Sequence, residues 1–279
     1  MTSIRAVYMA LVAACAFAMS AFALSAQAQA APAGSGHRMG SMDMDRMIRA
    51  FVLADQLEIQ PNVRERPVAL EFLSWVGGDY QRIFIRAQGE FPTQGRGDGE
   101  LQADVLYGRL LTPFWSAVAG ARVDTRPRAS VPAFRQDTDG AGRLDPSRRT
   151  RVTRGMLAVG LLGIAPYWFE FEPTLFISDQ GDVSAEIETS IDLLLTQRLI
   201  LQPRFELNAA VQGVPAFGIA SGLNDVEFGA RLRYEVRRKF APYVGVSWLR
   251  RTGATAASAQ AAGEPLGIGS IAAGVRLWR

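Results

Sequence analysis

The side chains best suited to metal chemistry are crowded into eleven positions near the amino terminus. One histidine and half of the chain's eight methionines lie there: His37, Met39, Met42, Met44 and Met47. Thioether sulfur and imidazole nitrogen suit Cu(I), and the carboxylates of Asp43 and Asp45 could add oxygen ligands for Cu(II). The alternative is a low-complexity or amphipathic leader that binds nothing, because a methionine cluster alone is a weak signal. We therefore treat the stretch as a candidate copper site.

This candidate site lies on a segment that we expect to be a flexible arm. Residues 31–47 are mostly small, polar or glycine, a composition that does not bury enough apolar surface to fold alone. The sequence that follows, residues 48–279, carries the patterns of a folded domain. The arm therefore has to be positioned by that domain.

The first thirty residues have the features of a secretory signal peptide. Arg5 precedes an apolar run over residues 6–24, and Ala26, Ala28 and Ala30 offer small-residue cleavage positions. The single cysteine, Cys15, lies inside this signal, so the exported protein would contain no disulfide. Lipidation at Cys15 and an uncleaved membrane anchor are the less favoured alternatives. We expect export, with the arm in the periplasm.

Composition argues against two classes of protein. Beyond the signal, no apolar run reaches the eighteen or so residues of a spanning helix, and the nearest, residues 156–169, is interrupted by glycine and proline. The formal net charge is only +3, with acidic and basic residues interspersed. A helical inner-membrane protein and a nucleic-acid partner are therefore both disfavoured.

Strict alternation of apolar and polar residues is clearest between residues 196 and 248. In residues 197–212 one face carries Leu199, Leu201, Phe205, Leu207 and Ala209. The other face carries Gln202, Arg204, Glu206 and Asn208. Such strands run about ten residues or more, the length that a tilted strand needs to cross a bilayer, whereas soluble strands average about five or six. The pattern predicts a membrane barrel, apolar outside and charged within.

Counting such segments predicts about twelve strands. The segments are residues 50–59, 68–76, 80–90, 100–111, 115–124, 150–162, 167–177, 183–194, 197–212, 226–236, 241–249 and 268–278. Short and long connections alternate between them, as they do between periplasmic turns and outer loops. The expected fold is all-β: a transmembrane, antiparallel, up-and-down β-barrel with a flexible N-terminal arm.

The inward faces of these strands carry many charges. We expect the following to face the lumen: Glu170, Glu172, Glu186, Glu188, Asp192, Arg204, Glu206, Arg231, Arg233 and Glu235. Buried charges are costly unless they are paired, so these groups must pair, face water or bind cations. A structural network of ion pairs is the favoured interpretation, and an acidic path for cations is the alternative.

Several stretches of the chain, in order from about residue 50 to the end, resemble the copper-resistance outer-membrane protein B family. They are WVGGD (75–79), RIFIRAQG (82–89), VLYGRLLTPFW (105–115), AGARVD (119–124), APYWFEFEPTLFIS (165–178), TQRLILQPRFELN (196–208), RLRYEVRRKFAPYVGVSW (231–248) and GVRLW (274–278). The resemblance implies a β-barrel of the Gram-negative outer membrane that binds copper and works beside a periplasmic multicopper oxidase. It also implies that the His37–Met47 stretch corresponds to the family's Met- and His-rich segment.

The leading hypothesis is therefore copper binding and handling at the outer membrane. The alternative is a small-solute or cation channel with no specific copper role, whose selectivity would come from lumen charges. An enzyme is not expected, because general-base chemistry usually needs histidine and His37 lies on the arm, away from the strands.

Overall fold

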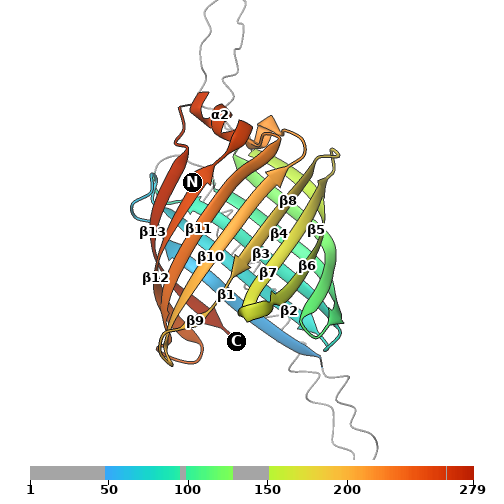
Figure 1. Ribbon diagram of the computed structural model, residues 1–279, viewed down its shortest axis with the longest axis vertical. Coiled ribbons are helices and arrows are strands. Elements are labelled where there is room, and N and C mark those ends of the chain that lie inside the picture. The colour runs from blue at the N-terminus through green and yellow to red at the C-terminus, as the bar shows by residue number, and fades with distance from the viewer. Residues whose placement is uncertain (1–47, 95–98, 128–150, 262) are drawn as a thin grey trace, which may run out of the picture.

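A closed antiparallel β-barrel accounts for most of the computed structural model, which describes residues 48–94, 99–127, 151–261 and 263–279. Figure 1 shows strongly tilted strands wrapping around one lumen. The strands are β1 (Arg49–Ile59), β2 (Pro67–Gly77), β3 (Gln81–Pro92), β4 (Glu100–Thr112), β5 (Trp115–Pro127), β6 (Arg151–Ala165), β7 (Phe169–Ser178), β8 (Val183–Ser190), β9 (Leu193–Leu194), β10 (Leu199–Ala210), β11 (Gly222–Tyr234), β12 (Phe240–Arg251) and β13 (Gly267–Trp278). The expected antiparallel, up-and-down β-barrel is confirmed, whereas the arm expected at residues 31–47 lies outside the described residues.

The ring has twelve members, because the two-residue β9 continues the line of β8 along β10. Each strand pairs with its neighbour in sequence, and β1 pairs with β13 to close the sheet. Beyond the end of β13, Arg279 exchanges two backbone hydrogen bonds with Val52, at 2.9 and 3.0 Å. Every strand of the ring therefore has two partners, as a sheet in lipid requires.

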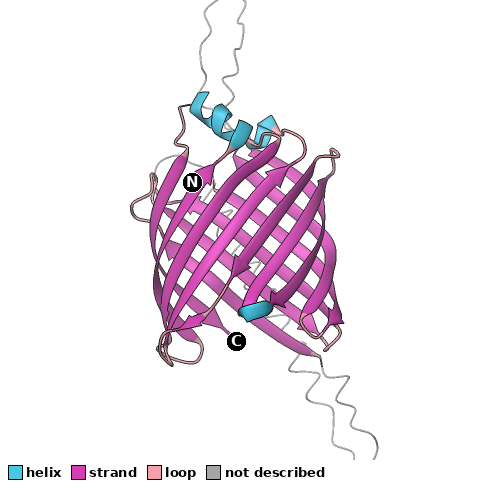
Figure 2. Ribbon diagram, viewed as in Figure 1, coloured by secondary structure: helices cyan, strands magenta, loops and turns pink. Residues whose placement is uncertain are grey.

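The two ends of the barrel differ. At one end, which we call the turn end, β1 begins, β13 finishes and the connections are short. The other end is the loop end. It carries the 3-10 helix η3 (Pro215–Phe217), between β10 and β11, and the helix α2 (Gly253–Ala261), between β12 and β13. Figure 2 shows the helices confined to the ends of the barrel. Membrane barrels of this kind have short periplasmic turns and longer outer loops, which assigns the turn end to the periplasm.

The helices of the described segments are short. None of them has the length and apolar character needed to cross a membrane. The helix η2 (Pro166–Trp168) forms the turn between β6 and β7, and α2 has nine residues.

The outer face of the strands is apolar. Side chains such as Val105, Val159, Val246 and Ile271 are more than half exposed in the isolated protein. They alternate along their strands with inward-facing residues, so exposed positions follow buried ones in β4 and β13. A broad exposed band of this kind is stable only against lipid. The alternation predicted from sequence thus corresponds to a lipid face and a lumen face.

Part of the lumen is apolar as well. A buried cluster joins the walls formed by β3 to β7, and its members are Phe84, Leu106, Val118, Met156, Ala158 and Phe176. Leu73, Trp75 and Leu162 pack against it. The sequence-based picture of a uniformly charged interior is therefore incomplete, because one side of the lumen has a hydrophobic core.

Some predicted boundaries differ from the structure. The segment predicted at residues 183–194 is split into β8 and β9, and β11 starts at Gly222 and stops at Tyr234. Glu235, predicted to lie on a lumen-facing strand, therefore falls in the turn that follows β11. The long link before β13 contains α2, which strand alternation does not reveal.

Candidate functional site

The predicted copper ligands His37, Met39, Met42, Met44 and Met47, with Asp43 and Asp45, lie outside the described residues. The described chain enters the barrel at the turn end, where β1 starts at Arg49. The segment that carries these ligands is therefore tethered to the end assigned to the periplasm.

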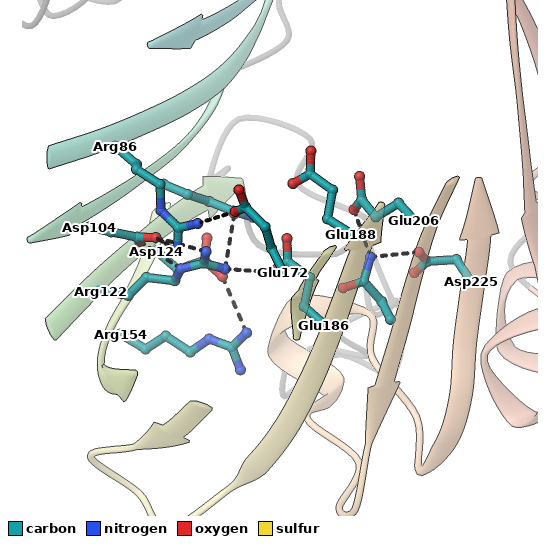
Figure 3. A network of polar contacts seen from close by, with 12 residues as sticks. Arg86, Asp104, Arg122, Asp124, Arg154, Glu172, Glu186, Glu188, Glu206 and Asp225 are labelled. Atoms are coloured by element: carbon teal, nitrogen blue, oxygen red, sulfur yellow. Dashed lines mark hydrogen bonds and ion pairs between the residues drawn. The ribbon is translucent and has the colours of Figure 1, made fainter. Parts of the chain in front are cut away.

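Among the described residues, the largest group of ion pairs in the lumen is centred on Arg122 of β5. Its guanidinium donates to both carboxylate oxygens of Asp104 on β4, with Nε–Oδ1 at 2.7 Å and Nη2–Oδ2 at 2.9 Å. Its remaining nitrogen reaches Glu186 on β8, with Nη1–Oε2 at 2.8 Å. Arg86 of β3 links the same Asp104 to Glu172 on β7, at 3.0 and 3.1 Å. Figure 3 shows Arg86 and Arg122 directed toward the carboxylates of the facing wall.

This Arg122 cluster is well buried and bridges strands that are not neighbours. The side chains of Arg122 and Asp104 are 7% and 4% exposed. The guanidinium of Arg122 also lies over the ring of Phe176, 3.9 Å from its centroid. Because two strands separate β5 from β8, the pair with Glu186 holds two parts of the wall together across the lumen. The planar guanidinium of arginine is suited to a two-pronged contact such as the one between Arg122 and Asp104.

A second group, the Arg204 cluster, spans almost the full width of the barrel. Arg204 of β10 binds Glu71 of β2, with Nη1–Oε2 at 2.7 Å, and Glu188 of β8, with Nη2–Oε1 at 2.8 Å. Glu206 lies 4.0 Å from the same guanidinium. In the ring, β2 and β10 are separated by four strands on one side and six on the other. Arg204 therefore places a cation near the middle of the lumen.

A third set of contacts lies beside it. Arg231 of β11 binds Glu58 of β1, with Nε–Oε2 at 3.3 Å, and donates to Gln56 at 2.8 Å. The hydroxyl of Tyr243 on β12 donates to Glu58 at 2.8 Å. Gln56 in turn donates to Glu71, which joins this set to the Arg204 cluster.

Tyr243→Phe tests the third set. Glu58 is only 4% exposed, so removal of the phenolic donor leaves a buried carboxylate with one partner fewer. We expect a loss of about 1.5–3 kcal/mol in the free energy of unfolding, as for hydrogen bonds to charged groups. Urea unfolding in lipid vesicles measures it. Tyr234→Phe is the matched control, because Tyr234 is exposed and should change stability by less than about 0.5 kcal/mol. Equal effects would contradict this account.

The remaining predicted lumen charges lie outside these three groups of contacts. Asp192 binds Arg233, with Oδ2–Nη2 at 2.7 Å. Glu170 accepts a hydrogen bond from Ser190 at 3.0 Å. Glu235 lies beyond β11, and its backbone N–H donates to the carbonyl of Arg198 at 2.8 Å.

Sequence reasoning missed several members of these groups. Glu58, Glu71, Asp104 and Arg122 were not singled out, nor were Asp124 and Arg154, which pair at 3.2 Å. The signal that could have found Asp104 and Arg122 is their position on predicted inward faces. Glu71 is harder to find, because it is the only charge in an otherwise apolar strand.

Two cavities open off the lumen, and both are lined mainly from its loop-end half. One, of about 220 Å³, is lined by residues that include Glu58, Glu71, Glu206, Arg204 and Arg231. The other, of about 160 Å³, is lined by residues that include Arg122, Arg154, Glu186, Ile219 and Asp225. The charged clusters thus form the inner walls of these cavities, in the half of the barrel that is farther from the turn end.

The described barrel has no ready-made metal centre. Over residues 48–94, 99–127, 151–261 and 263–279, no three His, Cys, Asp or Glu side chains are grouped so that they could hold a metal ion. The carboxylates described above are instead engaged mostly with arginine. The arrangement can brace the wall and fix the electrostatic potential of the lumen.

Comparison with known proteins gives one consistent result. Residues 48–279 match the family described as "Copper resistance protein B precursor (CopB)". The chain is 37% identical over 249 residues to Copper resistance protein B of Escherichia coli, an alignment that covers 88% of this chain and 75% of that protein. It is also 37% identical over 244 residues to the Copper resistance protein B homolog of Pseudomonas syringae pv. tomato, with 88% and 73% covered.

Similarity to solved structures is weaker. OmpT of Vibrio cholerae, an outer membrane protein solved with loop L8 deleted, has a TM-score of 0.38 and 6% identity, with 83% of this chain and 99% of that chain covered. The β domain of the Bordetella autotransporter BrkA has a TM-score of 0.33 and 12% identity, with 82% and 98% covered.

Proposed function

The chain belongs to the copper resistance protein B family, and from this we propose that it acts in copper resistance as a β-barrel of the Gram-negative outer membrane. The observation that carries the proposal is the family match over residues 48–279, which is the whole of the barrel. The closed sheet and the apolar outer band support a membrane location, since a sheet can cross a bilayer only as a closed barrel.

Copper binding is assigned to the N-terminal arm. Residues 31–47 carry the soft donors of the chain, whereas the barrel residues 48–279 contain one methionine, Met156, and no histidine. Carboxylates in the lumen are harder ligands and less selective for copper. The arm joins β1 at the turn end, which would let it capture copper ions in the periplasm after removal of the signal peptide at residues 1–30. A periplasmic multicopper oxidase is the partner that we propose at this end.

The lumen charges serve mainly as internal bracing in this proposal. Arg122 and Arg204 each tie carboxylates on separate strands, and such contacts oppose free passage along the lumen. Similarity to copper resistance proteins does not favour the alternative, a small-solute or cation channel without a copper role. We also propose that the protein is not an enzyme, as its only histidine lies on the arm.

Deletion of residues 31–47 should remove the tightest phase of Cu(I) binding. Thioether and imidazole donors are lost together, and the remaining carboxylates bind Cu(I) poorly. Isothermal titration of the mature protein and of the deletion variant, in detergent, measures the change.

A matched control separates ligand loss from deletion of chain. The variant with Met39, Met42, Met44 and Met47 all replaced by leucine keeps the arm's length and apolar volume but loses its sulfur ligands. It should reproduce the loss of the Cu(I) phase, while Asp43→Asn with Asp45→Asn should leave that phase in place. Unchanged Cu(I) binding after the deletion would move the site into the barrel.

A further inference from the structure

Two adjacent turns at the turn end combine positive charge with exposed apolar side chains. The turn between β9 and β10 carries Arg198, and the turn between β11 and β12 carries Arg237, Arg238 and Lys239. The turns touch, because the backbone N–H of Glu235 donates to the carbonyl of Arg198 at 2.8 Å. We call these four cations the basic patch.

Among the described residues, no carboxylate side chain pairs with the basic patch. All four side chains are exposed, and in the part of the chain that the structure describes none of them forms an ion pair. Glu235 is the single carboxylate on the two turns, so the patch keeps a net charge of 4 − 1 = +3. The arginines of the lumen, by contrast, are held by carboxylates. The cations of the patch are thus available to a ligand outside the barrel.

Exposed leucines lie directly beside the charges. Leu194 is 69% exposed and Leu195 is 55% exposed, at the point where β9 leads into the turn that carries Arg198. Adjacent exposed leucines are unfavourable in water but favourable at the boundary between headgroups and acyl chains. The turn end is where the lipid-facing band stops, so this boundary passes close to the two turns.

We propose that the basic patch, with Leu194 and Leu195, binds the headgroup and upper acyl chain of an anionic phospholipid in the periplasmic leaflet. The cations fit the phosphate, and the leucines fit the hydrocarbon just above it. An acidic protein would satisfy the charges but would leave the leucines without a partner. The inference depends on the membrane location proposed above and adds a lipid specificity to it.

The test compares binding of phosphatidylglycerol with binding of phosphatidylcholine to the full-length protein, by native mass spectrometry in detergent. The wild type should retain phosphatidylglycerol preferentially. Arg237→Gln with Arg238→Gln should lower its affinity by about ten- to thirtyfold, since each basic residue near an anionic surface contributes about fivefold. Leu194→Gln should weaken the binding of both lipids, because it removes an apolar contact and leaves the charges in place.

The matched control is Arg64→Gln with Arg66→Gln, which removes two exposed charges at the loop end that form no ion pair with any residue the structure describes. It should leave the phosphatidylglycerol preference intact. A difference in gel migration between unheated and heated samples checks that every variant forms the barrel. Equal binding of the two lipids by the wild type, an undiminished preference in the patch variant, or an equal loss in the control would each overturn the inference. Failure of the wild type to insert into vesicles would instead count against the membrane location itself.

Discussion

Arg122→Met should lower the free energy of unfolding of the barrel by about 3–5 kcal/mol, the cost of breaking a buried ion pair by removing one partner. The substitution keeps an unbranched side chain of similar length over Phe176 but removes the two-pronged partner of Asp104, whose side chain is 4% exposed, and releases Glu186. Arg86 still reaches Asp104, yet one cation then serves two carboxylates. Urea unfolding in vesicles, followed by tryptophan fluorescence, gives the change.

Arg49→Met is the control for this substitution. Arg49 pairs with Asp79 at 3.5 Å, and the two side chains are 59% and 44% exposed. Exposed pairs contribute only about 0–1 kcal/mol. A shift for Arg122→Met no larger than that for Arg49→Met would show that the Arg122 cluster does not brace the wall.

Arg204→Ala should destabilise the barrel by a similar amount, about 3–5 kcal/mol, and should also raise ion conductance through the lumen. Its guanidinium alone ties Glu71 on β2 to Glu188 on β8, across nearly the full width of the barrel. Without it, the cavity of about 220 Å³ gains depth, and Glu71 and Glu206, which line that cavity, lose the cation that they share. The added current should therefore be cation-selective. Planar bilayer recordings in asymmetric salt measure both the size and the selectivity.

Two further variants make this result specific. Arg204→Lys keeps the charge but lacks the planar fork, so it should give intermediate stability and conductance. Arg250→Ala removes an arginine that lies over Trp248, on the lipid-facing side of β12, and should leave conductance unchanged. If Arg204→Ala conducts no better than the wild type, ions are blocked elsewhere, and the apolar cluster around Leu106 becomes the leading candidate.

Strand positions were predictable because a wall between lipid and a charged interior imposes a period of two. In β10 the polar series Gln202, Arg204, Glu206 and Asn208 makes that period visible. In β2 it is obscured, because the lumen side of that strand carries Leu73 and Trp75 next to Glu71. Charge therefore marks the inward face only where the interior is wet.

Partners across the lumen could not be predicted from alternation. That Arg204 meets Glu71 depends on ring closure and strand tilt, which place residues 133 positions apart at the same height. Irregularities add to the difficulty: the register between β1 and its neighbours shifts near Ala54, which changes the direction in which the following residues point. The helix α2 was missed because a short alanine-rich stretch has no periodic apolar face.

The pairing of β1 with β13 has a consequence for how the barrel forms. All other strand pairs of the ring join neighbours in sequence, so they can assemble as successive hairpins, whereas this pair must wait until the whole sheet has been laid down. Until then β1 and the most recently added strand expose unpaired backbone edges, which invite aggregation. Closure of the ring is thus the last and slowest step of assembly, because its two strands lie at opposite ends of the barrel sequence. The lifetime of the open sheet decides whether the chain inserts into the membrane or aggregates.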